Sequence, residues 1–217
     1  MKKLSILALI AAMACGLAPA SRGETESWLN EIDGGLILHF PAVSDFDLYE
    51  LGFGLDLQYR NWSLDPVGLA FSLGVAGWNV DNEANDLGAE HTDFDGSVTT
   101  VPIGASVLFY LYGTQDFSII LEAGLRYMIT DADVDLNRVI TTDEGEEKVP
   151  ATMEIDDGLV GLLAVEADFS MNEQFLLFGG LGYQDDIERG EITTEAGPLK
   201  DNKFASFFFR FGAKYVF

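Results

Sequence analysis

The C-terminal segment of the chain alternates between two kinds of side chain. In an extended strand successive side chains point to opposite faces, and one face of residues 207–217 is almost wholly aromatic. That face carries Phe207, Phe209, Phe211, Ala213, Tyr215 and Phe217. Lipid covers such a face without further polypeptide, so the segment predicts a strand that contacts a membrane. The alternative is an edge or core strand of a periplasmic sandwich.

The segment resembles the closing strand of Gram-negative outer-membrane β-barrels, in which a terminal Phe follows alternating apolar and aromatic residues. The resemblance implies that the outer-membrane assembly machinery is a partner. It also implies a C-terminal assembly signature, made of Phe207, Phe209, Phe211, Tyr215 and Phe217.

The N-terminal residues have the pattern of a secretory signal peptide. Lys2 and Lys3 precede an apolar run over residues 4–14, and small residues at 18–20 suit a signal peptidase. We therefore expect a signal peptide over residues 1–20 and a single barrel domain over 21–217. The run is too short to span a membrane as a helix. The only cysteine, Cys15, lies inside the signal; the alternative is a lipoprotein lipidated at Cys15, although the residues before it do not fit that motif.

Acidic residues are abundant but unevenly distributed. The chain has 36 Asp and Glu against 12 Lys and Arg, yet its mean hydropathy is positive. Segments 81–97, 130–157 and 184–202 hold 22 of these acids, and we expect them to be surface loops. This charge excludes nucleic acid as a partner. It favours divalent cations as partners of these loops. The other partners that we expect are outer-membrane lipid and lipopolysaccharide.

Alternation between these segments predicts eight strands. Their expected ranges are 32–43, 48–60, 66–80, 98–112, 117–129, 158–169, 174–184 and 204–217. Tight turns at 61–65, 113–116 and 170–173 alternate with the acidic segments and with a short connection at 44–47. This pattern predicts an all-β fold, an eight-stranded antiparallel up-and-down transmembrane β-barrel in the cell outer membrane. The mature chain resembles the opacity-type proteins and the transmembrane domain of the major outer-membrane protein A family.

Charges within the strands all lie opposite the apolar face of their own strand. Shifting a strand by one residue would reverse every side chain, so this agreement predicts that the charges face a lumen. Glu50 shares that face. The expected lumen charge network consists of Asp56, Arg60, Glu122, Arg126, Glu166, Asp168, Arg210 and Lys214. Small residues such as Gly74 and Gly104 on the same face suit a narrow, packed interior.

Aromatic residues also gather near the predicted strand ends, as two interfacial girdles require. We expect one girdle near the turns, with Tyr59, Phe109, Phe169 and Phe175, and one near the loops, with Tyr49, Tyr127 and Tyr183.

Catalytic and metal motifs are weak. The only histidines are His39, on the first strand, and His91, in an acidic segment; neither shows the His and Ser arrangement of lipid-modifying barrels, so we expect no enzyme and no cofactor. The acidic repeat over residues 131–137 has Leu136 where an EF-hand needs Gly and Thr142 where it needs Glu. We interpret it as a strand extending above the membrane, with weak divalent-ion binding as the alternative.

Two functions remain. The first is a barrel with a plugged lumen and acidic surface loops, in a structural or surface-interaction role. The second is a narrow channel or small-solute uptake protein, and a lipid-modifying enzyme is a weaker third. Fold alone does not decide between them.

Overall fold

The computed structural model describes most of the chain beyond the signal segment. It covers residues 30–42, 49–64, 66–80, 91–142, 145–151, 153–194, 197–201 and 204–217. The predicted signal peptide, Cys15 and the connection at 44–47 lie outside these residues. Within the described part, no helix has the length and apolar character needed to cross a membrane.

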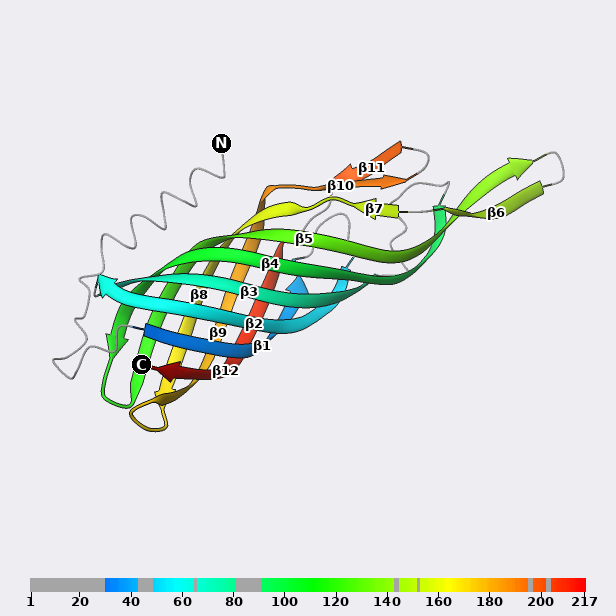
Figure 1. Cartoon of the computed structure of the whole chain (residues 1–217). Coiled ribbons are helices and arrows are strands. Elements are labelled where there is room, and N and C mark those ends of the chain that lie inside the picture. The colour runs from blue at the N-terminus through cyan, green and yellow to red at the C-terminus, as the bar shows by residue number, and fades with distance from the viewer. Residues whose placement is uncertain are drawn as a thin grey trace.

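Eight strands close into one barrel (Figure 1). They are β1 (Asn30–Pro41), β2 (Tyr49–Leu64), β3 (Val67–Val80), β4 (His91–Gly113), β5 (Phe117–Thr142), β8 (Gly158–Ser170), β9 (Phe175–Glu188) and β12 (Ser206–Val216). Each pairs antiparallel with the next, and β1 pairs with β12 to complete the circle. The predicted eight-stranded up-and-down barrel is confirmed.

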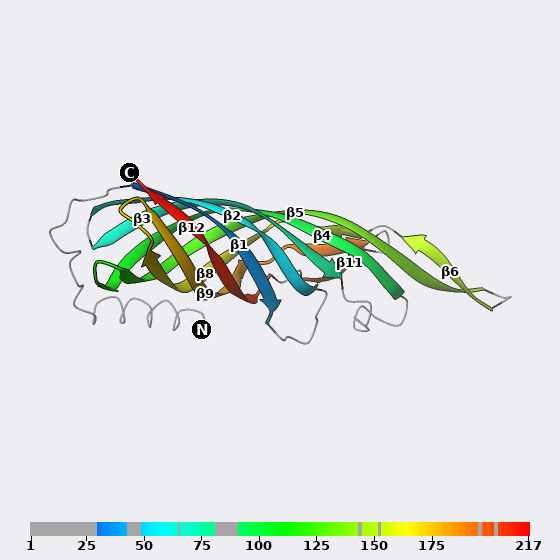
Figure 2. The same ribbon diagram turned by 90° about the horizontal axis from the view of Figure 1, so that it is seen from below.

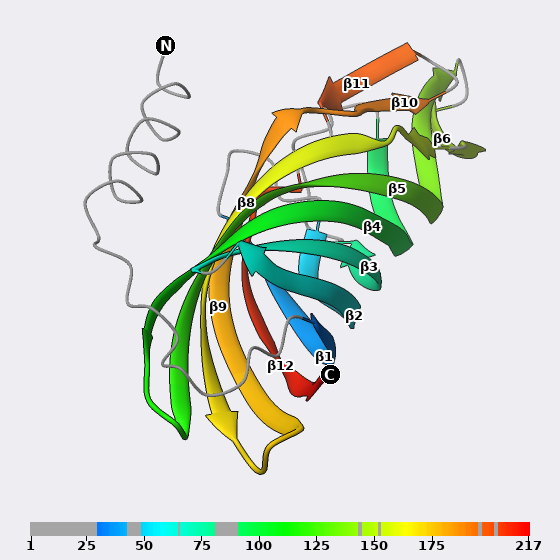
Figure 3. The ribbon, with the colours of Figure 1, turned by 60° about the vertical axis from the view of Figure 1, so that its left-hand side comes forward.

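The barrel exterior is apolar and the interior is polar at mid-height. On β2 the outward Phe53 and Leu55 are 64% and 59% exposed, whereas the neighbouring Asp56 is buried in the lumen. The aromatic face of β12 also points outward, with Phe207 and Tyr215 exposed. Figure 3 shows the curvature of the wall that separates these two faces. An apolar band around a closed barrel is the surface that contacts lipid.

The acidic segments are largely strands, and the prediction that they are loops is wrong for the described residues. Strands β4 and β5 run far beyond the barrel and pair as far as His91 with Arg138. The additional strands are β6 (Gly145–Ala151), β7 (Met153–Ile155), β10 (Glu191–Thr194) and β11 (Gly197–Asp201). Strand β6 pairs antiparallel with the last part of β5, and β7, β10 and β11 form a separate sheet, at the end away from the C-terminus (Figures 1 and 2). Buried and exposed side chains still alternate along these strands, and Val134 and Ile192 are among the buried ones.

The opposite end has the short turns. The turn at 113–116 is confirmed, with the Thr114 amide donating to the Phe117 carbonyl at 2.7 Å. Strands β8 and β9 are joined by residues 171–174, close to the prediction. The predicted turn at 61–65 is shorter, because Trp62 is buried on the inner face and β2 continues to Leu64.

One interruption in the barrel wall lies between β3 and β4. Leu73 pairs with Ile103 and Ala76 with Thr100, but the two residues between them on each strand do not pair. Pro102 lies in this gap and has no N–H to donate. We call this gap the Pro102 break.

Candidate functional site: the barrel lumen

Apolar side chains fill both ends of the lumen. Near the extended strands a surface cluster is formed by Trp78, Val80, Val98, Met128, Val134, Met153, Ile155, Val160, Ile192 and Phe204. Near the short turns a turn cluster is formed by Trp62, Ala70, Leu108, Tyr110 and Ile120. The expected lining of small residues and charges therefore describes only the middle of the lumen.

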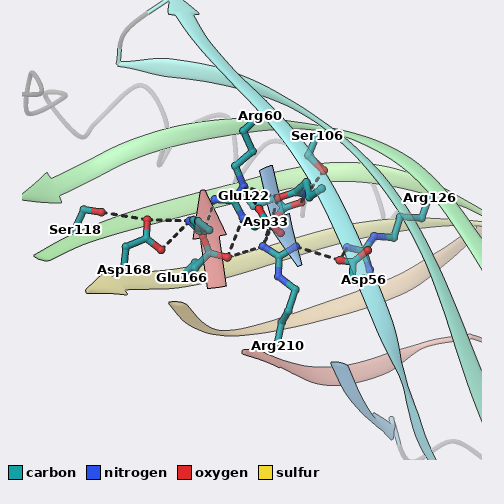
Figure 4. Close-up of polar contacts among 12 residues, drawn as sticks. Asp33, Asp56, Arg60, Ser106, Ser118, Glu122, Arg126, Glu166, Asp168 and Arg210 are labelled. Atoms are coloured by element: carbon teal, nitrogen blue, oxygen red, sulfur yellow. Dashed lines mark hydrogen bonds and ion pairs between the residues drawn. The ribbon is translucent and has the colours of Figure 1, made fainter. Parts of the chain in front are cut away.

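All eight residues of the lumen charge network are buried in that middle layer. They come from the neighbouring strands β5 and β8 and from β2 and β12, and Figure 4 shows most of these side chains meeting in one group. Arg60 on β2 donates two hydrogen bonds to Glu166 on β8, of 2.6 and 2.9 Å. This bidentate contact joins two strands that are not neighbours in the wall.

Glu166 is the centre of the network. Besides Arg60, it forms ion pairs with Arg210 and Lys214. The Lys214 ammonium also lies 2.8 Å from Asp168, which accepts a hydrogen bond from Ser118. A carboxylate with three cationic partners is well compensated for its burial.

Asp56 joins the other side of the network. Its Oδ2 atom accepts hydrogen bonds from Arg126 at 3.0 Å and from Arg210 at 3.1 Å. In Figure 4 this carboxylate lies between the two guanidinium groups. Phe178 from β9 covers Arg210, with the guanidinium carbon 5.1 Å from the ring centroid.

Glu122 is held mainly by neutral groups. It accepts hydrogen bonds from Gln58 at 2.9 Å and Ser106 at 2.8 Å, while Arg210 lies 3.5 Å away. The Glu122 and Arg210 contact is therefore weaker than the pairs around Glu166.

Sequence reasoning missed several members of the layer. Asp33 on β1 lies 2.7 Å from the Arg60 Nε atom, and Gln58 also contacts Arg60. Both residues alternate in phase with the inward face of their strands, so the signal was present in the sequence. Glu50, by contrast, is exposed beside a register shift at the end of β2 and does not join the network.

One of the two histidines lies beside a serine inside the barrel. His39 Nδ1 lies 3.2 Å from Ser206 Oγ, because closure of β1 against β12 joins residues that are 167 positions apart. Both side chains are buried on the luminal face. His39 also packs on Trp78, with ring centroids 4.7 Å apart. The pair therefore faces the lumen and not the lipid-facing exterior.

The acidic repeat over residues 131–137 is part of β5, as the strand interpretation predicted. Asp131 and Asp133 are exposed on one face, and Val134 is buried on the other. His91 begins β4 rather than lying in a loop. Among the described residues, no group of three potential metal ligands comes together.

Aromatic residues lie at both ends of the exterior. Tyr59, Phe169 and Phe175 are exposed near the turns, and Tyr127 is exposed near the extended strands. The Tyr127 hydroxyl donates to Asp157 at 2.9 Å. Phe109 and Tyr183 are half-buried, and the Tyr49 side chain is outside the description.

Comparison with known proteins supports the fold. No protein-family model matches the sequence, and no curated protein matches it. Among solved structures, the outer membrane protein OprG from Pseudomonas aeruginosa is 17% identical, with a TM-score of 0.58 over 87% of this chain and 95% of OprG. A major outer membrane protein from Thermus thermophilus is 19% identical, with a TM-score of 0.50 over 87% of this chain and 99% of that protein.

The chain has the fold of the small eight-stranded outer-membrane β-barrels. A closed barrel pairs backbone groups between neighbouring strands around the whole wall and leaves no open sheet edge in lipid, and single-chain barrels with an apolar exterior are characteristic of outer membranes. The fold and the exposed apolar band together place the protein in the outer membrane.

Proposed function

We propose that the protein is a sealed outer-membrane barrel that carries an acidic β-structure at the cell surface, in a structural or surface-interaction role. The observation that supports the seal is the bidentate contact of Arg60 with Glu166 across the lumen. Ion pairs to Arg210 and Lys214 continue the same layer. The surface and turn clusters lie on either side of it.

The surface role is supported by the extended strands. Asp131, Asp133, Glu147, Glu154 and Glu191 are exposed on this part of the chain. Carboxylates on an outer surface attract divalent cations, which also bridge the phosphates of lipopolysaccharide. We therefore propose these cations and outer-membrane lipid as partners, the assembly machinery as the partner during insertion, and no role in nucleic-acid binding or catalysis.

Conductance in planar bilayers tests the seal. We expect the purified barrel to give no steady ion current, and Arg60→Ala to give a measurable leak because it removes the cross-lumen contact. Ser63→Ala is the matched control, since Ser63 is exposed at the turn end of the same strand. Steady current through the unmodified barrel would reject the proposal.

Small-solute uptake is the second candidate, and the Pro102 break is the observation that favours it. A wall lacking ladder hydrogen bonds at one point is easier to open there than elsewhere. Flux of small uncharged solutes into proteoliposomes, without ion current, would support this candidate over the sealed barrel.

A further inference from the structure

The charged layer in the middle of the lumen holds more carboxylates than cations. Among the described residues, its buried carboxylates include Asp33, Asp56, Glu122, Glu166 and Asp168, whereas its buried cations are Arg60, Arg126, Arg210 and Lys214. Glu31 on β1 is also acidic and cannot supply positive charge. His39 faces Arg126, so it is not the cation that balances the layer. The described part of the layer is therefore short of at least one positive charge.

Asp33 on β1 is the carboxylate that the hydrogen bonds of the layer leave out. It is 0% exposed, and neither of its oxygens accepts a hydrogen bond from a described residue. Its Oδ2 atom lies 2.7 Å from Arg60 Nε, but the one N–H of that nitrogen is donated to Gln58 at 2.6 Å. The other two nitrogens of Arg60 donate to Glu166. Figure 4 shows Asp33 within this group of side chains.

A proton fits the missing charge better than a metal ion does. No group of three possible metal ligands comes together in the described part of the chain, whereas calcium and magnesium each need several oxygen ligands. A proton needs one oxygen, and Asp33 Oδ1 is buried without a hydrogen-bond partner. A buried carboxylate that is not compensated by its surroundings becomes neutral by binding a proton.

We propose that the lumen is a proton-binding site and that Asp33 holds the proton at neutral pH. The charged groups that face Asp33 are Arg60 from β2, Arg210 and Lys214 from β12, and Glu166 from β8. The rest of the charged layer consists of Glu31, Asp56, Glu122, Arg126 and Asp168. All three cations that face Asp33 form ion pairs with Glu166, so none of them is reserved for Asp33.

The proton links the stability of the barrel to pH. An aspartate in an unfolded chain has a pKa of about 3.9, so above about pH 6 the unfolded barrel has released this proton and the folded barrel retains it. Stability falls with rising pH wherever the folded state binds more protons. For one proton, the folding equilibrium constant should fall about tenfold per pH unit from about pH 7 upward, until Asp33 ionises in the folded barrel. Exposed carboxylates do not titrate in this range.

Infrared spectroscopy of the folded barrel in lipid vesicles tests the site directly. A protonated carboxyl group has a C=O stretching band that a carboxylate lacks. We expect this band at pH 7 in the unmodified barrel and its loss in Asp33→Asn, which replaces the acid by a neutral side chain of similar shape. Urea unfolding across the same pH range should show the tenfold slope in the unmodified barrel and no such slope in Asp33→Asn.

Asp131→Asn is the matched control, since Asp131 is an exposed acid on β5, and it should change neither the band nor the slope. Asp33→Glu keeps a carboxyl group and should shift the band without removing it, which decides the question if Asp33→Asn does not fold. Absence of the band at pH 7, its survival in Asp33→Asn, an unshifted band in Asp33→Glu, or equal slopes with and without Asp33 would each overturn the proposal. Planar-bilayer conductance measures the seal independently, so failure of the sealed barrel is distinguishable from failure of this site.

Discussion

Arg60 and Glu166 are joined by two parallel hydrogen bonds although their strands, β2 and β8, are not neighbours in the barrel wall. Arginine matches a carboxylate with a planar fork, which fixes direction as well as distance. The contact therefore holds β2 and β8 in a fixed relative position across the lumen. It also makes Glu166, rather than Glu122, the residue on which the charged layer depends.

Glu166→Ala should destabilise the barrel more than Glu122→Ala does. Removing Glu166 leaves Arg60, Arg210 and Lys214 with one fewer buried partner, and breaking a buried pair in this way costs about 3–5 kcal/mol. Glu122→Ala mainly loses bonds from Gln58 and Ser106, so its cost should be smaller. Urea unfolding in lipid vesicles measures both, and equal costs would contradict the central position of Glu166.

A charge on the exterior should be penalised according to its depth. Leu55 lies midway along β2 and is 59% exposed, whereas Leu64 lies at the turn end and is 64% exposed. Leu55→Arg should cost about 2–4 kcal/mol in a bilayer and Leu64→Arg about 0–1 kcal/mol. The same unfolding assay checks this, and similar costs for two equally exposed sites would argue against lipid contact at Leu55.

Deletion of Phe217 should impair outer-membrane assembly while leaving export intact. The Phe217 ring is exposed and stacks on Tyr215, and its amide donates to the Asn30 carbonyl at 3.0 Å where the barrel closes. Heat-dependent gel mobility of the outer-membrane fraction reports the closed barrel. Phe217→Tyr keeps the ring and the amide and serves as the control; normal levels of the deleted form would show that Phe217 is dispensable.

Chelation should increase protease cutting between Thr130 and Asp157. Exposed carboxylates such as Asp131, Asp133 and Glu154 repel one another unless divalent cations screen them. Limited proteolysis in EDTA, with magnesium restored as the control, measures the effect, and the gel mobility of the barrel should not change. Cutting that is independent of magnesium would remove cation bridging from the proposal.

Alternation in the sequence determined the architecture because strand geometry has a period of two. The aromatic face of residues 207–217 and the charges at Asp56, Arg60, Glu122 and Arg126 each show which side of a strand meets lipid. That pattern lies within each strand, so it can be recognised without knowing which strands pair. It also extended correctly to Asp131 and Asp133, whose strand continues beyond its pairing with β8.

Tertiary structure alone decided which residues meet across the lumen and where the strands end. Closure of β1 against β12 brings His39 to Ser206, and closure of the whole barrel brings Arg60 across the lumen to Glu166. Both contacts depend on the strand register around the full circle. Strand pairing also overrode the acidic composition of residues 130–142, since buried Val134 holds that segment in the sheet. Composition records charge, but only the folded barrel shows which side chains can be buried together.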